Sequence, residues 1–63
     1  MNPISRLIAA ARELRLQREA NWNYKLSQFE TKGLIPPDSH ALKSARNEFD
    51  RACKAFLEEN QHL

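Results

Sequence analysis

The sequence predicts an all-α fold, an antiparallel helical hairpin with one helix at about 3–32 and a second at about 38–60. Apolar residues recur with a helical period in both segments, and neither segment contains an internal glycine or proline. The one glycine, Gly33, and the adjacent prolines Pro36 and Pro37 separate the two segments. A chain of 63 residues has room for a single domain, which we expect to span 1–63.

The first helix has sequence signals at both of its ends. Asn2 can accept a hydrogen bond from the free backbone N–H groups of the first turn, and Pro3 suits the first helical position. Gly33 suits the left-handed conformation that commonly follows the last helical residue. We therefore expect one continuous helix of about 30 residues, roughly 45 Å long.

The link between the helices is predicted to be extended and stiff. A residue that precedes a proline is pushed out of the helical region, and this applies to both Ile35 and Pro36. Asp38 or Ser39 then caps the second helix, because both side chains accept hydrogen bonds from backbone N–H groups.

The second helix has one apolar face. Large and small residues alternate along this face, as in the packed seam of a coiled-coil-like bundle. The face consists of Leu42, Ala45, Phe49, Ala52, Cys53, Phe56 and Leu57. We interpret Cys53 as a small core residue, since no histidine is placed to activate its thiol.

The first helix has more apolar surface than a hairpin requires. One side carries Ile4, Leu7, Ile8, Ala11, Trp22, Leu26 and Phe29, and a weaker opposite ribbon carries Ala9, Leu16, Ala20 and Tyr24. Folding the hairpin at its link predicts that Leu26 lies opposite Ala45. The same register places Trp22 opposite Phe49, in the core. The surplus apolar surface indicates that this helix also contacts a partner.

The start of the first helix is predicted to form a dimer interface. In the predicted register it lies near or beyond the end of the second helix, so it is left uncovered. A chain this short also has little core of its own. We therefore predict a homodimer that forms a four-helix bundle, with an interface made by Ile4, Leu7, Ile8 and Ala11.

Further along the first helix we predict a surface that binds a target. Three arginines at three-residue spacing can meet acidic side chains or phosphates, with ion pairing across the bundle as the alternative. Tyrosine is typical of interfaces because its ring is apolar and its tip polar. The predicted partner-binding residues are Arg12, Arg15, Leu16, Arg18, Ala20 and Tyr24.

Composition and motifs argue against several classes of protein. Charged residues make up 29% of the chain, and its net charge is +2. No apolar run is long enough for a transmembrane helix, and the start of the chain lacks the order of a secretion signal. One cysteine and two histidines provide neither a disulfide nor metal-ligand spacing. We expect a cytoplasmic protein that is not an enzyme, with no catalytic residues, cofactor or metal.

The hairpin resembles two groups of small helical proteins. Its length, its plan, the layered face and the tripeptide Arg51-Ala52-Cys53 are similar to the Rop family of plasmid copy-number proteins. That resemblance implies a helical-hairpin dimer that binds paired RNA hairpins. In size, helical content and an exposed amphipathic helix, the chain also resembles short bacteriophage proteins that disable host proteins, such as anti-activators of quorum-sensing regulators. This second resemblance implies a protein that binds and inhibits a regulator of transcription.

Three hypotheses for function remain open. The favoured one is a small regulator or inhibitor that binds a target protein through an exposed helical face. The alternative is nucleic-acid binding through the first helix, because residues 1–32 carry six basic and three acidic groups, whereas residues 33–63 carry four and five. A structural or assembly subunit is the third, and it predicts larger oligomers.

Overall fold

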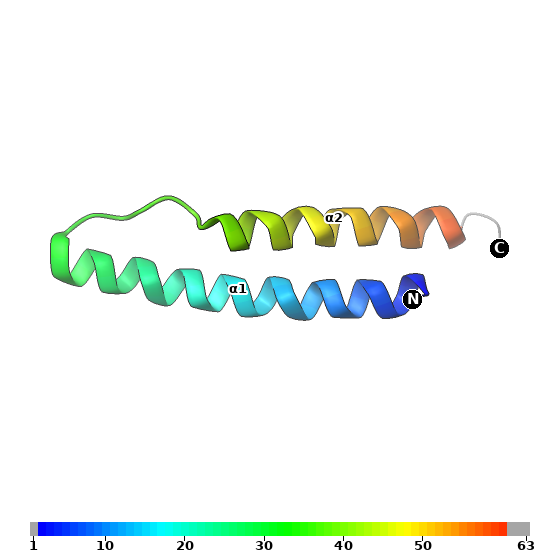
Figure 1. The fold of residues 1–63 in the computed structure, drawn as a ribbon, viewed down its shortest axis with the longest axis horizontal. Coiled ribbons are helices and arrows are strands. Elements are labelled where there is room, and N and C mark those ends of the chain that lie inside the picture. Colours follow the sequence, from blue (N-terminus) through cyan, green and yellow to red (C-terminus); the bar gives the residue numbers. More distant parts are fainter. Residues whose placement is uncertain (1, 61–63) are drawn as a thin grey trace.

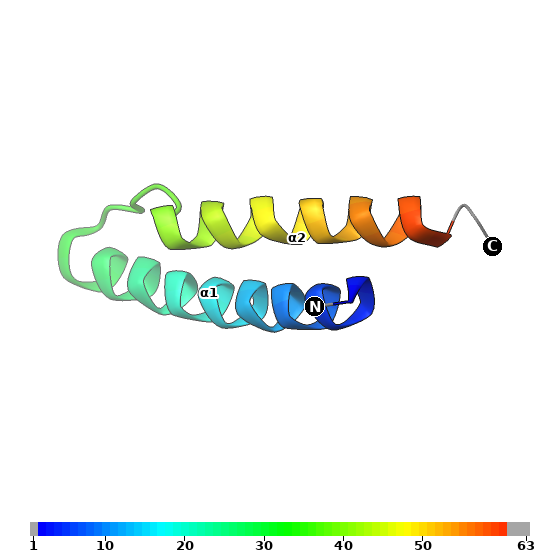
Figure 2. The same ribbon diagram turned by 45° about the vertical axis from the view of Figure 1, so that its right-hand side comes forward.

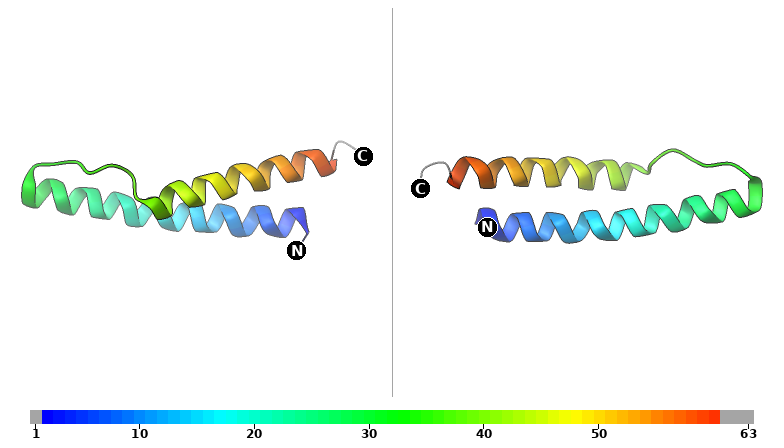
Figure 3. Two further views of the ribbon diagram at one scale, coloured as in Figure 1. Left: turned by 45° about the horizontal axis from the view of Figure 1, so that its top comes forward. Right: turned by 180° about the vertical axis from the view of Figure 1, so that it is seen from behind.

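The computed structural model describes residues 2–60, which form two antiparallel α-helices packed as a hairpin (Figure 1). Helix α1 spans Pro3–Lys32, and helix α2 spans His40–Asn60. The hairpin is elongated, at 52 × 15 × 13 Å. The helices stay alongside each other when the molecule is turned (Figures 2 and 3). The predicted all-α hairpin is therefore confirmed.

Both predicted ends of α1 are confirmed. Asn2 Oδ1 accepts a hydrogen bond from the backbone N–H of Ser5 at 2.8 Å, and Pro3 is the first helical residue. Gly33 adopts the left-handed conformation with φ 68°, and its N–H donates to the carbonyl of Phe29 at 2.8 Å. A helix stop of this kind needs a residue that tolerates positive φ, which glycine does without strain.

Helix α2 begins slightly later than predicted. Ser39 is the cap, because its Oγ accepts from the N–H of Leu42 and its carbonyl accepts from the N–H of Lys43, both at 3.1 Å. The other predicted cap, Asp38, instead directs its carboxylate at side chains of α1 and α2. The first helical residue is consequently His40.

The register of the hairpin differs from the predicted one. The connecting segment 33–39 runs back along the last turns of α1 before α2 begins (Figures 1 and 3). A segment of this length covers roughly 20 Å when extended. Ser39 therefore meets Asn21, at 2.9 Å from its backbone N to Oδ1, and α2 starts opposite the middle of α1. The predicted pairing of Leu26 with Ala45 and Trp22 with Phe49 was wrong.

The core between the helices is small. The buried apolar residues among those described are Ala10, Leu42, Ala45 and Ala52. Three of them belong to the predicted apolar face of α2, which is confirmed for those positions. Phe49, Cys53 and Phe56 of that face are half-buried, and Leu57 is exposed. Small side chains let the helix backbones approach closely, but they remove little apolar area from water.

Helix α1 turns toward α2 a different face from the one predicted. The less exposed residues on this inner face recur at three- and four-residue spacing. They are Pro3, Leu7, Ala10, Leu14, Gln17, Asn21, Lys25 and Gln28. The inner face is mainly apolar as far as Leu14 and polar beyond it. Trp22, predicted to be core, is 61% exposed, because it lies beyond the start of α2 and to the side of the inner face.

Candidate functional site

A polar network fixes the point where the connecting segment meets α1. Asn21 is 7% exposed, and its Oδ1 accepts from the backbone N–H of Ser39 at 2.9 Å. Its Nδ2 donates to Asp38 Oδ1 at 3.4 Å. One buried amide therefore holds both residues that precede α2. A buried polar group with its partners in place favours one arrangement over its competitors, so this network defines the register.

Two cations complete the network around Asp38. Lys25 Nζ lies 2.6 Å from Asp38 Oδ1, and Arg46 Nη2 lies 3.4 Å from Oδ2. The hydrogen bond from Lys25, together with the positive charge of Arg46, lowers the pKa of Asp38 below its ordinary value. Asp38 thus joins the last turns of α1 to the first turns of α2.

A second ion pair joins the first turn of α1 to the middle of α2. Arg6 contacts Glu48 through Nε at 2.9 Å and Nη2 at 3.0 Å, a bidentate arrangement. The hydrogen bond from Arg6 lowers the pKa of Glu48, and the same bond raises the pKa of Arg6. Both side chains are partly exposed, so this pair aligns the helices more than it stabilises them.

One side of α1 presents large apolar residues to solvent. These residues are displaced from the inner face by about a quarter turn, at about 100° per residue. We call this side the lateral face, and its exposed apolar members are Ile4, Ile8, Trp22, Leu26 and Phe29. It corresponds to the apolar side predicted from the sequence, but the hairpin leaves it largely uncovered. Two arginines on the same side divide these residues into a cluster near the start of α1 and a cluster near its end. Exposed apolar clusters on a small protein indicate contact sites.

Two adjoining grooves lie between the lateral face and the connecting segment. The first has a volume of about 550 Å³, and we call it the cationic groove. Its lining is Arg15, Arg18, Glu19, Asn21, Trp22, Lys25, Ile35, Leu42 and Arg46. The second has a volume of about 220 Å³, and we call it the apolar groove. Its lining is Trp22, Lys25, Leu26, Phe29 and Ile35.

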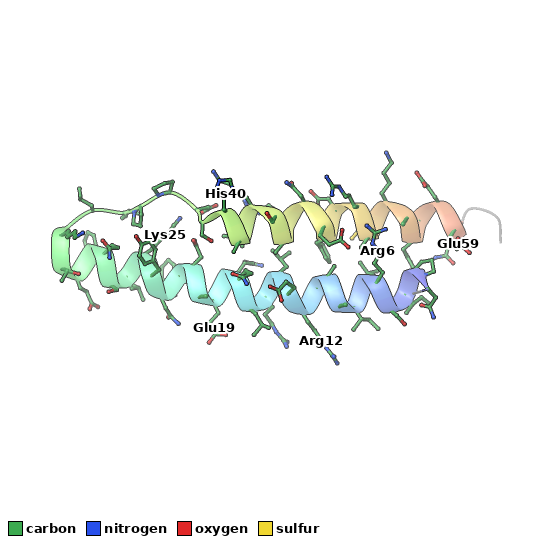
Figure 4. The ribbon with its side chains drawn as sticks, in the orientation of Figure 1. Arg6, Arg12, Glu19, Lys25, His40 and Glu59 are labelled. Atoms are coloured by element: carbon green, nitrogen blue, oxygen red, sulfur yellow. The ribbon has the colours of Figure 1, made fainter. Side chains whose placement is uncertain are left out.

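The predicted partner-binding residues lie on different sides of α1. Arg15 and Arg18 line the cationic groove. Arg12 points away from α2 (Figure 4) and lines neither groove. Leu16, Ala20 and Tyr24 are also exposed, but helical geometry places them on the flank opposite the lateral face. The six residues therefore do not form one surface.

The predicted dimer interface is mostly accessible. Ile4, Ile8 and Ala11 are exposed, whereas Leu7 is half-buried on the inner face. Contrary to the predicted register, these residues do not extend beyond α2. We call the end of the hairpin where α1 starts and α2 finishes the open end. A hollow there is lined by residues of both helices, among them Ile4 and Phe56.

Sequence reasoning missed several of the residues that build the site. Asn21 was not selected, although Leu7, Leu14, Asn21 and Gln28 recur every seven residues. That heptad spacing identifies the inner face. Lys25, Ile35 and Arg46 were also missed, because their neighbourhood depends on the path of the connecting segment. No pattern along the chain reveals that path.

Comparisons with protein-family models, with curated proteins and with solved structures found no significant match. The relation to the two groups named above therefore extends only to the plan of a two-helix hairpin. Within residues 2–60, no helix has the length and apolar character needed to cross a bilayer. Over the same range, no group of His, Cys, Asp and Glu side chains is arranged so that it could hold a metal ion.

Proposed function

We propose that this chain is a small, non-enzymatic binding protein that regulates or inhibits a target protein. The observation that carries the proposal is the apolar groove, in which Trp22, Leu26 and Phe29 stay exposed beside Ile35. Aromatic side chains in a hollow are typical of the anchors that dominate protein–protein affinity. A hairpin of this size would otherwise bury such residues to stabilise itself.

The polar network supports this proposal by holding the groove open. Ile35 lies on the connecting segment, and the network anchors the end of that segment to α1 through Asn21 and Asp38. The proline-containing segment is stiff as well. A site held in its binding shape loses less conformational entropy when a partner docks.

We further propose that the protein is a homodimer that forms a four-helix bundle. The exposed apolar residues at the open end, Ile4, Ile8 and Leu57, have no covering helix in the hairpin. The core of four small or medium side chains is modest for a stable monomer. Two hairpins that lie side by side along their packed halves would bury Ile4 and Ile8 and leave the apolar groove free. The molar mass in solution, measured by light scattering across concentration, tests this arrangement.

A second candidate function is nucleic-acid binding, which the four cations lining the cationic groove favour. Trp22 in the same groove offers a ring on which a base can stack. Binding of this kind weakens steeply with added salt, because phosphate neutralisation releases counterions. Docking of a protein in the apolar groove depends much less on salt.

The proposed function is tested by identifying what lies on the groove in the cell. A photo-crosslinking phenylalanine analogue replaces Phe29 in one variant, Tyr24 in a second and Lys43 in a third. Lys43 is exposed and lines neither groove, so it serves as the control. We expect a discrete adduct with another protein at Phe29 and none at Lys43. An adduct only at Tyr24 would move the site to the opposite flank. Adducts with nucleic acid, or none at any position, would contradict the proposal.

A further inference from the structure

We infer that the two grooves together bind an acidic segment of the target. A large apolar side chain occupies the apolar groove, and carboxylates on the same segment meet Arg15 and Arg18 in the cationic groove. This inference rests on the proposed function and names the chemistry of its partner.

The grooves form one continuous site. Trp22, Lys25 and Ile35 line both of them, so no wall separates the apolar part from the cationic part. Trp22 stands at the junction and is exposed. A ligand that places an apolar side chain against Trp22 therefore has its neighbouring residues next to the arginines.

The charge of the cationic groove is only partly neutralised by the protein. Four cations and one carboxylate line it, and Asp38 pairs with two of those cations, Lys25 and Arg46. Within residues 2–60, neither Arg15 nor Arg18 forms an ion pair. The groove and Asp38 together therefore carry an excess of two positive charges. Two guanidinium groups one helical turn apart suit bidentate contact with carboxylates.

The spacing along α1 sets the length of the bound segment. From Arg15 to Phe29 the helix rises by about 21 Å, at about 1.5 Å per residue. A bound helix covers this distance with about fourteen residues, and an extended strand with about six. The partner segment thus carries its apolar anchor at one end and its carboxylates within a few turns of it.

A nucleic acid fits this surface less well than an acidic protein segment. Phosphates follow one another at short, regular intervals, and binding them needs an uninterrupted row of cations. Here the cations end at Lys25, and the site continues as an apolar groove. A polyanion would leave Leu26 and Phe29 uncovered, whereas a segment with an apolar anchor covers them.

A second copy of the chain also fits this part of the surface poorly. In a two-fold dimer that overlaps along the whole lateral face, the middle of one copy meets the middle of the other. Arg15 and Arg18 would then face their own counterparts, and like charges at short range repel. Two copies of the chain can therefore contact each other at the open end, whereas charge repulsion opposes their contact at the cationic groove.

The inference is tested with a display library of random fourteen-residue peptides selected on the immobilised protein. We expect the enriched peptides to combine Asp or Glu with a large apolar residue. The same selection is repeated on an Arg15→Gln/Arg18→Gln variant and on Arg12→Gln as the matched control. Arg12 is an exposed arginine of the same helix that lines neither groove. Circular dichroism checks that each variant remains helical.

The expected affinities distinguish an effect of the groove arginines from an effect of the overall charge of the protein. An enriched peptide should bind the double variant at least about tenfold more weakly and Arg12→Gln with nearly unchanged affinity, because only the groove arginines contact its carboxylates. Replacing the glutamates of the peptide by glutamine should cause a similar loss on the wild type and little on the double variant. Leu26→Asp should abolish binding through the apolar end.

Several outcomes would overturn the inference. One is enrichment of neutral or basic peptides, or no enrichment at all. Another is an equal loss of peptide affinity in the Arg12→Gln variant. A third is displacement of the peptide by an RNA duplex whose own affinity is unchanged in the Leu26→Asp variant. A crosslink from Phe29 to a second copy of the chain would assign the groove to the dimer. A protein adduct at Phe29 with peptides that show no acidic preference would refute this inference alone. Absence of any protein adduct in the cell would instead refute the proposed function.

Discussion

The two halves of this hairpin are held together by different forces. Where α2 lies against α1, small apolar residues such as Ala10 and Ala52 pack at the contact. Where α1 continues beyond α2, only the connecting segment lies beside it, and a polar network around Asn21 and Asp38 holds that segment in place. Every buried apolar residue within 2–60 belongs to the packed half, which leaves other large apolar residues exposed, and the other half exposes Trp22. Lost stability should therefore follow changes of the buried residues, and lost binding should follow changes of the exposed residues that line the grooves.

The largest expected effect is a loss of unfolding free energy when the main core side chain of the packed half is truncated. Leu42 is 3% exposed, so Leu42→Ala leaves a cavity and should cost about 2–4 kcal/mol of unfolding free energy. Phe29→Ala removes a larger but exposed side chain and should cost less than about 0.5 kcal/mol. Urea unfolding at one fixed protein concentration measures both. Equal losses would contradict the division into two halves.

The next effect concerns the polar network. Asn21→Leu removes the acceptor of the Ser39 N–H and the donor to Asp38. At about 0.5–1.5 kcal/mol for each hydrogen bond, the two losses should cost about 1–3 kcal/mol. Asn23→Leu, at an exposed position on the same helix, is the matched control and should be nearly neutral. Hydrogen exchange of the Ser39 amide should accelerate in Asn21→Leu and remain slow in the control. Unchanged exchange would show that the network does not anchor the segment.

A smaller loss is expected at the end of α1. Gly33→Ala places a side chain at φ 68°, where it is strained, although no atom lies within 4 Å of the added Cβ. The cost is therefore conformational alone, about 1 kcal/mol. Gly33→Asn should cost less, because asparagine tolerates this conformation better. The midpoints of thermal unfolding rank the stability of the two variants. A lower midpoint for Gly33→Asn than for Gly33→Ala would exclude backbone strain as the cause.

The smallest effect is a dependence on acid. The folded-state pKa values of Asp38 and Glu48 are lowered from 3.8 and 4.5, so their contribution to stability is fully present above those ordinary values. It is lost as the pH falls through the lowered values. The midpoint of thermal unfolding should therefore decline below about pH 4.5. An Asp38→Asn/Glu48→Gln variant should decline less, and identical profiles would show that these pairs contribute nothing.

The helices of this fold could be predicted from the sequence, because their signals are local. Asn2, Pro3 and Gly33 mark the ends of α1 through the bonds and dihedral angles of single residues. The register could not be predicted in the same way. It depends on how far the connecting segment runs before α2 starts, and the contact of Asn21 with Ser39 decides that.

The candidate site was predictable only in part, for a related reason. Arg15 and Arg18 were identified from their spacing, and they do line a groove. Trp22 was placed in the core because the most apolar side of α1 was expected to pack against α2. The face that packs carries Ala10 and Asn21, since close approach and one buried hydrogen-bonded amide favour that contact. Apolar content alone therefore did not identify the inner face.

The antiparallel plan brings the start of α1 and the end of α2 to the same end of the hairpin (Figure 1). Asn2 and Asn60 line one hollow there. The apolar groove lies toward the opposite end of a molecule 52 Å long. A dye, an affinity handle or a surface linker attached near either of these residues therefore stands far from the groove. Immobilised in this way, the protein keeps its apolar groove accessible to the solution.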